Sequence, residues 1–169
     1  TEAAVEAAKR IARYLKGTRK LGISYSPQKE RDFRETYEKV ASEQEKSLGE
    51  WAAFTDSDFA GDSVTLKSTS GSILYFRGTP IVWSARRQQI RALSTCEAEY
   101  VAAFDCIKLC RSQGYLDFFF EEDGFPILFC DNQSAIALSK SSIVTKRSKH
   151  MHLRYHTVKD YVNSLCFCP

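Results

Sequence analysis

The segment that most constrains the fold is a short apolar run, Trp51–Thr55, which ends abruptly in the carboxylates Asp56, Asp58 and Asp62. Its residues are apolar or β-branched and are bounded by turn formers, which predicts a buried strand. A carboxylate at the end of such a strand loses hydration, and neighbouring carboxylates add repulsion. A hard divalent cation, which prefers oxygen ligands, compensates both costs. We therefore expect a metal site where this strand ends.

Length and hydropathy restrict the class of protein. A chain of 169 residues suits one domain with a sizeable core. Its apolar runs are far shorter than the ~20 residues that a membrane-crossing helix needs. The alanine-rich N-terminus contains acids, lacks the apolar segment of a signal peptide and resembles the cut end of a longer chain. We expect an intracellular, cytoplasmic protein with no membrane partner.

The six cysteines lie mostly in apolar, periodic segments, where cysteine behaves as a small hydrophobe. This predicts reduced thiols. A zinc site is the alternative, because Cys106 and Cys110 are one helical turn apart and His152 and His156 repeat that spacing. No CxxC pair supports zinc.

The net charge of +3 is mild, but the charges are unevenly distributed. Residues 63–96 and 132–159 contain basic side chains and no acid. Taken together, the two segments indicate a polyanion track beside a metal site. For either segment alone, a solvated face is the simpler interpretation.

The segments before the acidic strand carry weaker signals. Helical spacing of apolar residues predicts a helix from Thr1 to about Lys16, which Gly17 ends. Leu21–Tyr25 is a plausible strand that stops before Pro27. Residues 28–50 are highly charged, which is typical of a mobile loop or a solvent-facing helix, and we expect no chemistry there.

After the acidic strand, Ser72–Phe76 and Pro80–Ser84 are apolar runs separated by Arg77 and Gly78, which predicts a hairpin. The three strands then form an antiparallel meander. We expect a helix from Ser94 or Thr95 to about Leu109. Within it, Glu97 fits a capping box with Ser94. Glu99 lies about 200° around the helix from Glu97 and is free to face the sheet.

A second buried strand, Pro126–Cys130, also ends in an aspartate, Asp131, where a helix begins at once. For Asp131 alone, an N-cap is the default interpretation. Two strands that each end in a carboxylate, with Glu99 on the helix between them, favour a shared site. The remaining expected elements are a short helix over 115–122, a basic loop over 142–149, a helix over 150–163 and a strand over 165–169.

Five blocks together resemble the ribonuclease H domain of copia-type LTR retrotransposon Pol polyproteins: FTDSDFAGD, KSTSG, IVWSARRQQIRALSTCEAEYVAA, FCDNQSAIAL and RSKHMHLRYH. AAKRIARYLKGTRKLGISY resembles the adjoining end of the reverse transcriptase connection. The likeness covers nearly the whole chain except residues 28–50. It implies a connection segment (1–27), a charged loop or linker (28–50) and a ribonuclease H-like domain that lacks its final helix (51–169).

The resemblance implies an α/β fold of the ribonuclease H type, with a mixed sheet of about five strands, an antiparallel meander followed by parallel strands, flanked by helices. It implies cleavage of the RNA strand of RNA/DNA hybrids during retrotransposon reverse transcription. Two Mg²⁺ ions, which Mn²⁺ can replace, would activate water and stabilise the leaving oxygen. On the family pattern, Asp56 bridges both ions, Glu99 supports the ion near the leaving group, and Asp131 holds the other.

The resemblance also implies substrate contacts. Gln133 matches a position that contacts the minor groove, and its amide can donate to and accept from a ribose 2′-hydroxyl. The other expected contacts are Ser94, Thr95, Arg86, Arg87, Arg91, Lys146, Arg147, Lys149 and His150. The implied partners are the hybrid and the reverse transcriptase domain of the same polyprotein, in virus-like particles.

The chain departs from the family in its acids. A fourth acid, normally on a final helix, is missing, and His150-Met151-His152 stands where the family has His-Ile-Asp. A catalytically inactive module that binds nucleic acid or scaffolds the reverse transcriptase is therefore an alternative. Another is a different nuclease or transposase of the same fold, such as an integrase, against which KSTSG and EAEYVAA argue.

Overall fold

The computed structural model describes residues 1–112, 125–140, 152–161 and 165–168. In chain order the elements are α1 (Glu2–Thr18), α2 (Pro27–Ser42), β1 (Trp51–Asp58), β2 (Thr69–Phe76), β3 (Thr79–Arg87), α3 (Thr95–Ser112), β4 (Ile127–Cys130), α5 (Gln133–Lys140), α6 (His152–Asp160) and β5 (Leu165–Phe167). The helix expected over 115–122 and the basic loop over 142–149 lie outside the described residues.

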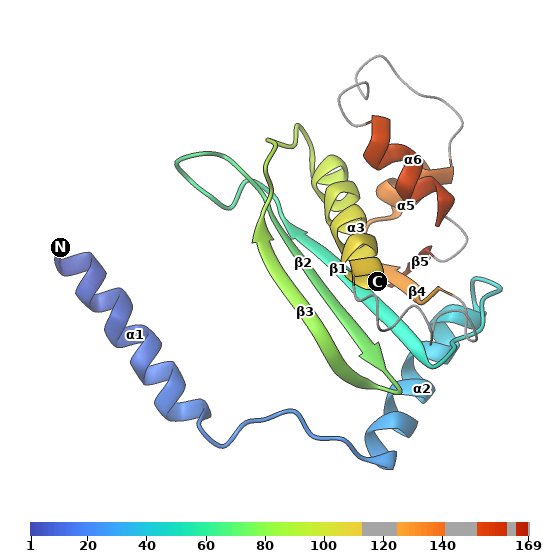
Figure 1. Cartoon of the computed structure of the whole chain (residues 1–169), viewed down its shortest axis with the longest axis horizontal. Coiled ribbons are helices and arrows are strands. Elements are labelled where there is room, and N and C mark those ends of the chain that lie inside the picture. The colour runs from blue at the N-terminus through green and yellow to red at the C-terminus, as the bar shows by residue number, and fades with distance from the viewer. Residues whose placement is uncertain (113–124, 141–151, 162–164, 169) are drawn as a thin grey trace.

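Among the described residues, one sheet has the strand order β3-β2-β1-β4-β5 (Figure 1). β1 pairs antiparallel with β2, and β2 with β3, whereas β4 runs parallel to both β1 and β5. In this register Thr55 lies between Ser72 of β2 and Cys130 of β4. The predicted mixed sheet of five strands, an antiparallel meander followed by parallel strands, is confirmed.

Helices cover both faces of the sheet, and β1 contributes alternate residues to two cores. Trp51 and Ala53 belong to the core beneath α3, with Tyr100. Ala52 belongs to a second core, together with Ala41 at the end of α2. A central strand that is buried on both faces needs apolar residues at every position, which explains the unbroken apolar run.

The charged segment 28–50 is more ordered than its composition indicates. Ser26 caps α2 by accepting a hydrogen bond from the Lys29 amide at 3.3 Å. One side of the helix then packs on the sheet, because the ring centroid of Tyr37 lies 4.9 Å from that of Phe54 and 5.2 Å from that of Phe129. Of the two predicted alternatives, a mobile loop and a solvent-facing helix, Pro27–Ser42 form a helix, but one side of this helix packs on the sheet and does not face solvent.

The prediction of a strand at Leu21–Tyr25 is wrong. These residues have no regular structure, and their apolar side chains are exposed. Figure 1 shows the segment running from α1 to α2 away from the sheet, so its backbone finds no strand to pair with. The preceding helix α1 also buries none of its residues.

The predicted hairpin is confirmed between β2 and β3. Arg77 and Gly78 have φ angles of 46° and 74°, the left-handed pair typical of a two-residue type I′ turn. A Cβ atom on Gly78 would lie 2.8 Å from the Cβ atom of Phe33. Close packing of α2 on the turn therefore requires glycine at this position.

All six cysteines are free, as predicted. Cys106 and Cys110 are buried in the core beneath α3, and they are not in the one potential metal-binding group found among the described residues. The zinc alternative at this pair is therefore not supported. Within the described part of the chain, no helix has the length and apolar character needed to cross a membrane.

Candidate metal centre

Two of the three predicted acids meet at one end of the sheet. Asp131 directly follows β4, and Glu99 lies in the second turn of α3. One carboxylate oxygen of each residue and the sulfur of Cys130 all lie within 4.8 Å of one another. The end of β4 and helix α3 therefore bring together ligand atoms from distant parts of the sequence.

Glu99 is held in place by Ser57 of β1. Its Oε1 accepts hydrogen bonds from the Ser57 amide at 3.1 Å and from the Ser57 hydroxyl at 2.6 Å. Its Oε2 is buried and has no hydrogen-bond partner in the structure. A buried carboxylate oxygen without a partner is costly. A cation would satisfy this oxygen, so the residue fits a metal ligand.

The electrostatics of Glu99 support the same conclusion. Burial raises the pKa of its carboxyl above the ordinary value of 4.5, and the negative charges of Asp131 and Asp56 raise it further. The hydrogen bonds from Ser57 act in the opposite direction. Three carboxylates therefore repel one another at a site where a divalent cation would relieve the repulsion.

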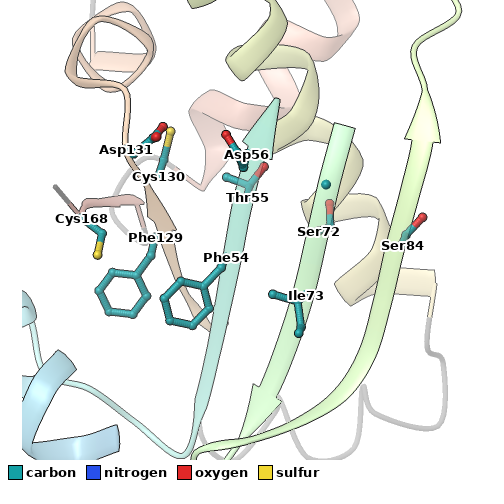
Figure 2. Close-up of a pocket in the computed structure, with 11 residues that line it drawn as sticks. Phe54, Thr55, Asp56, Ser72, Ile73, Ser84, Phe129, Cys130, Asp131 and Cys168 are labelled. Atoms are coloured by element: carbon teal, nitrogen blue, oxygen red, sulfur yellow. The ribbon is translucent and has the colours of Figure 1, made fainter. Parts of the chain in front are cut away.

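Asp56 is exposed, and its Oδ1 accepts a hydrogen bond from the Ser57 amide at 2.8 Å. It lines a pocket of about 430 Å³ together with Asp131. Figure 2 shows both carboxylates at one end of this pocket, above the rings of Phe54 and Phe129. Asp56 therefore borders the centre, although it lies outside the group of atoms that meet within 4.8 Å.

Other residues provide the helix caps, which leaves the predicted acids free. Asn132 accepts a hydrogen bond from the Ala135 amide at 2.9 Å, so Asn132 and not Asp131 caps α5. At α3, the Ser94 hydroxyl accepts from the Glu97 amide at 3.1 Å. The Glu97 carboxylate accepts a hydrogen bond from the Leu93 amide at 2.7 Å, one residue before the cap. The Ser94 half of the predicted capping box is therefore confirmed, and Glu97 has a structural role at the start of α3.

Asp62 was expected to add to the repulsion near Asp56, and this expectation is wrong. Its carboxylate accepts hydrogen bonds from the amides of Val64 and Thr65, and it pairs with Arg87 at 2.5 Å. These donors lower its pKa, the Thr65 amide most of all. Asp62 therefore orders the loop between β1 and β2.

The predicted substrate contacts lie in several places. Gln133 is exposed at the start of α5, and Ser94 and Thr95 are exposed at the start of α3. Arg86 and Arg87 line a groove of about 450 Å³ between β3 and α3, together with Lys108 and Arg154. Lys146, Arg147, Lys149 and His150 lie outside the described residues.

Two residues of the centre were missed by the sequence analysis. Ser57 holds Glu99, and Cys130 adds a thiol beside the carboxylates. Burial raises the pKa of Cys130 to about 12, and the nearby acids add to this effect, so the free thiol is protonated. Each residue is the sequence neighbour of a predicted aspartate, but only the tertiary structure shows its contact with Glu99.

Comparisons with known proteins identify relatives by sequence. The chain is 40% identical over 114 residues, 65% of its length, to the retrovirus-related Pol polyprotein from transposon TNT 1-94 of Nicotiana tabacum. It is 29% identical over 169 residues, 97% of its length, to that from transposon RE1 of Arabidopsis thaliana. The chain spans only 8% and 10% of these relatives.

No family model matches the chain. Among solved structures, it is similar to LC11-RNase H1 in complex with an RNA/DNA hybrid, with a TM-score of 0.45 and 17% identity. That similarity covers 70% of this chain and 83% of the other. The structural similarity is weak, so the relationship to known proteins rests on the sequence similarity.

Proposed function

We propose that this chain, a homologue of one segment of the retrovirus-related Pol polyproteins of transposons, is a metal-dependent endonuclease of the ribonuclease H type. It hydrolyses the RNA strand of RNA/DNA hybrids during reverse transcription. The observation that carries this proposal is the buried Oε2 of Glu99, which lacks a partner and belongs to a residue that meets Asp131 at the end of β4.

The proposed cofactor is Mg²⁺, held by Asp56, Glu99 and Asp131, because Mg²⁺ prefers oxygen ligands. When bound, two such ions supply an activated water and stabilise the leaving oxygen, and Mn²⁺ can replace them. The chain contributes preorganised ligands. Ser57 fixes the orientation of Glu99, and the Asn132 cap leaves the carboxylate of Asp131 available.

The proposed substrate contacts are exposed polar and basic side chains. Gln133 is exposed two residues after Asp131, and its amide can both donate to and accept from a 2′-hydroxyl, the group that distinguishes RNA from DNA. Ser94 and Thr95 are exposed on the segment that leads to Glu99. Arg86 and Arg87 at the end of β3 would contact phosphates.

The proposed protein partner is the reverse transcriptase domain of the same polyprotein, in cytoplasmic virus-like particles. The similarity to the Arabidopsis polyprotein covers 97% of the chain. α1 carries exposed apolar side chains, Val5, Ile11 and Leu15, and buries none of its residues here. We assign residues 1–27 to the connection with that partner.

Cleavage of a labelled RNA/DNA hybrid tests the proposal. We expect cutting of the RNA strand with Mg²⁺ or Mn²⁺ and no cutting in EDTA. The cleavage rate should fall at least about 100-fold in Glu99→Gln and in Asp131→Asn, which is the effect of removing one electrostatic catalytic group. Glu97→Gln is the matched control on the same helix, because the glutamine side chain can still accept the hydrogen bond from the Leu93 amide.

The possible outcomes separate the candidate functions. Cleavage that persists in EDTA, or in Glu99→Gln, would overturn the metal-dependent mechanism. Hybrid binding without cleavage by the unaltered chain would favour the inactive module that binds nucleic acid or scaffolds the reverse transcriptase. Equal cutting of double-stranded DNA would favour a different nuclease of the same fold.

A further inference from the structure

A thiol lies among the carboxylates of the metal centre. Cys130 is 2% exposed, and its sulfur is within 4.8 Å of ligand oxygens of Glu99 and Asp131. The proposed nuclease mechanism assigns no role to this sulfur atom. We propose that Glu99, Cys130 and Asp131 form a binding site for a thiophilic divalent cation, Zn²⁺ or Cd²⁺, with Cys130 as the sulfur ligand.

The set of ligand atoms favours such an ion over Mg²⁺. Mg²⁺ takes an octahedron of oxygen ligands at about 2.0–2.1 Å, and a thiolate is a poor member of that shell. Zn²⁺ binds cysteine sulfur and carboxylate oxygen together, and thiolate ligands select soft and borderline metals. Two carboxylates and one thiol therefore form a mixed site in which the sulfur decides the selectivity.

The geometry is close to what a tetrahedral ion needs. Bonds of about 2.0–2.3 Å place the ligand atoms about 3.3–3.8 Å apart. From the observed upper limit of 4.8 Å, the ligand atoms need to approach one another by at most about 1–1.5 Å, which side-chain torsions supply. The unpartnered Oε2 of Glu99 is available as a ligand, while Ser57 holds the other oxygen of the same carboxylate. Water completes the shell.

A second cysteine lines the same pocket but lies differently. The Cys168 amide donates a hydrogen bond to the Cys130 carbonyl at 2.9 Å, so the two backbones are adjacent. In Figure 2 the sulfur of Cys130 lies beside the carboxylate of Asp131, whereas the sulfur of Cys168 points away from it. Cys168 is also absent from the metal-binding group. It therefore serves as a control thiol.

Binding replaces the proton of the Cys130 thiol, and this proton passes to solvent. The bound ion then offsets the repulsion among Asp56, Glu99 and Asp131. It also occupies oxygens that the proposed function assigns to Mg²⁺. If that function holds, Zn²⁺ or Cd²⁺ competes with Mg²⁺ and inhibits cleavage. The binding site itself does not depend on the nuclease proposal.

Titration of the full chain with Cd²⁺ tests the site through the ultraviolet charge-transfer absorption of the cadmium–thiolate bond. We expect the absorption to saturate at one equivalent in the unaltered chain and in Cys168→Ser. Cys130→Ser should lose the absorption and bind Cd²⁺ at least about tenfold more weakly. Asp131→Asn should keep the absorption and bind more weakly.

Circular dichroism verifies that each variant is folded. An unchanged absorption in folded Cys130→Ser, or no saturation near one equivalent in the unaltered chain, would overturn the proposal. If Cys130→Ser does not fold, Glu99→Gln is the second test. Unaltered Cd²⁺ affinity in that variant would equally exclude the site. Mg²⁺-dependent cleavage is measured separately, so failure of the nuclease proposal leaves this result intact.

Discussion

Ser57 on β1 donates two hydrogen bonds to a single oxygen of Glu99 on α3, from its amide at 3.1 Å and from its hydroxyl at 2.6 Å. This contact joins the C-terminal end of β1 to a residue of α3 that lies 42 positions later in the sequence. It also leaves the second oxygen of Glu99 free of hydrogen bonds in the structure. Ser57 is therefore a positioning residue for the metal centre.

Ser57→Ala should weaken both metal binding and stability. Loss of a hydrogen bond to a charged group costs about 1.5–3 kcal/mol of unfolding free energy, and loss of a ligand's supporting partner lowers metal affinity about 10–100-fold. Urea denaturation and a Mn²⁺ titration measure the two effects. Ser63→Ala, at an exposed loop position, is the control. Unchanged Mn²⁺ affinity in Ser57→Ala would contradict the positioning role.

Glu99→Gln should stabilise the metal-free protein at neutral pH. Burial and the charges of Asp131 and Asp56 raise the pKa of Glu99 above its ordinary 4.5, so the folded state binds its proton more tightly than the unfolded chain does. The penalty of the charged form is present above the folded pKa and disappears as the pH falls below the unfolded value.

Thermal unfolding of both proteins against pH, without metal, measures this effect. The melting temperature of Glu99→Gln should exceed that of the unaltered chain at pH 7, and the difference should shrink as the pH falls toward 4. Added Mg²⁺ should raise the melting temperature of the unaltered chain only. A less stable Glu99→Gln at pH 7 would show that the carboxylate is not under electrostatic strain.

Much of the site was predictable because its signals are local. Apolar runs that precede Asp56 and Asp131 mark β1 and β4, although β1 continues to Asp58, and helix geometry distinguishes Glu99 from Glu97. The roles of Cys130 and Ser57 were not predictable, because they depend on contacts between the sheet and Glu99 on α3. The packing of α2 was missed because Phe33 and Tyr37 are isolated among charges. Leu21–Tyr25 has a strand-like composition, but a strand also needs a partner.

Arg86→Ala and Arg87→Ala should each weaken hybrid binding in a salt-dependent way. Both side chains are exposed and line the groove between β3 and α3. Each lost phosphate contact lowers the slope of log affinity against log salt concentration by about 0.7–0.9. Fluorescence anisotropy over a salt series in EDTA measures this slope. Arg10→Ala on α1 is the control. An equal loss of hybrid affinity in that variant would indicate a nonspecific effect of charge.

The two N-terminal helices should differ sharply in their contribution to stability. The ring of Phe33 on α2 lies 4.7 Å from that of Tyr37 and 5.3 Å from that of Tyr75, so Phe33→Ala removes packing on the sheet. Because Phe33 is only partly buried, we expect Phe33→Ala to lower the free energy of unfolding by about 2–3 kcal/mol. This is at or below the lower end of the range for a buried phenylalanine. α1 buries no residue, so deletion of residues 1–18 should change the unfolding free energy by less than about 0.5 kcal/mol. Urea denaturation of the two variants measures both values. Equal losses would contradict the assignment of α2 to the folded domain and of α1 to the connection.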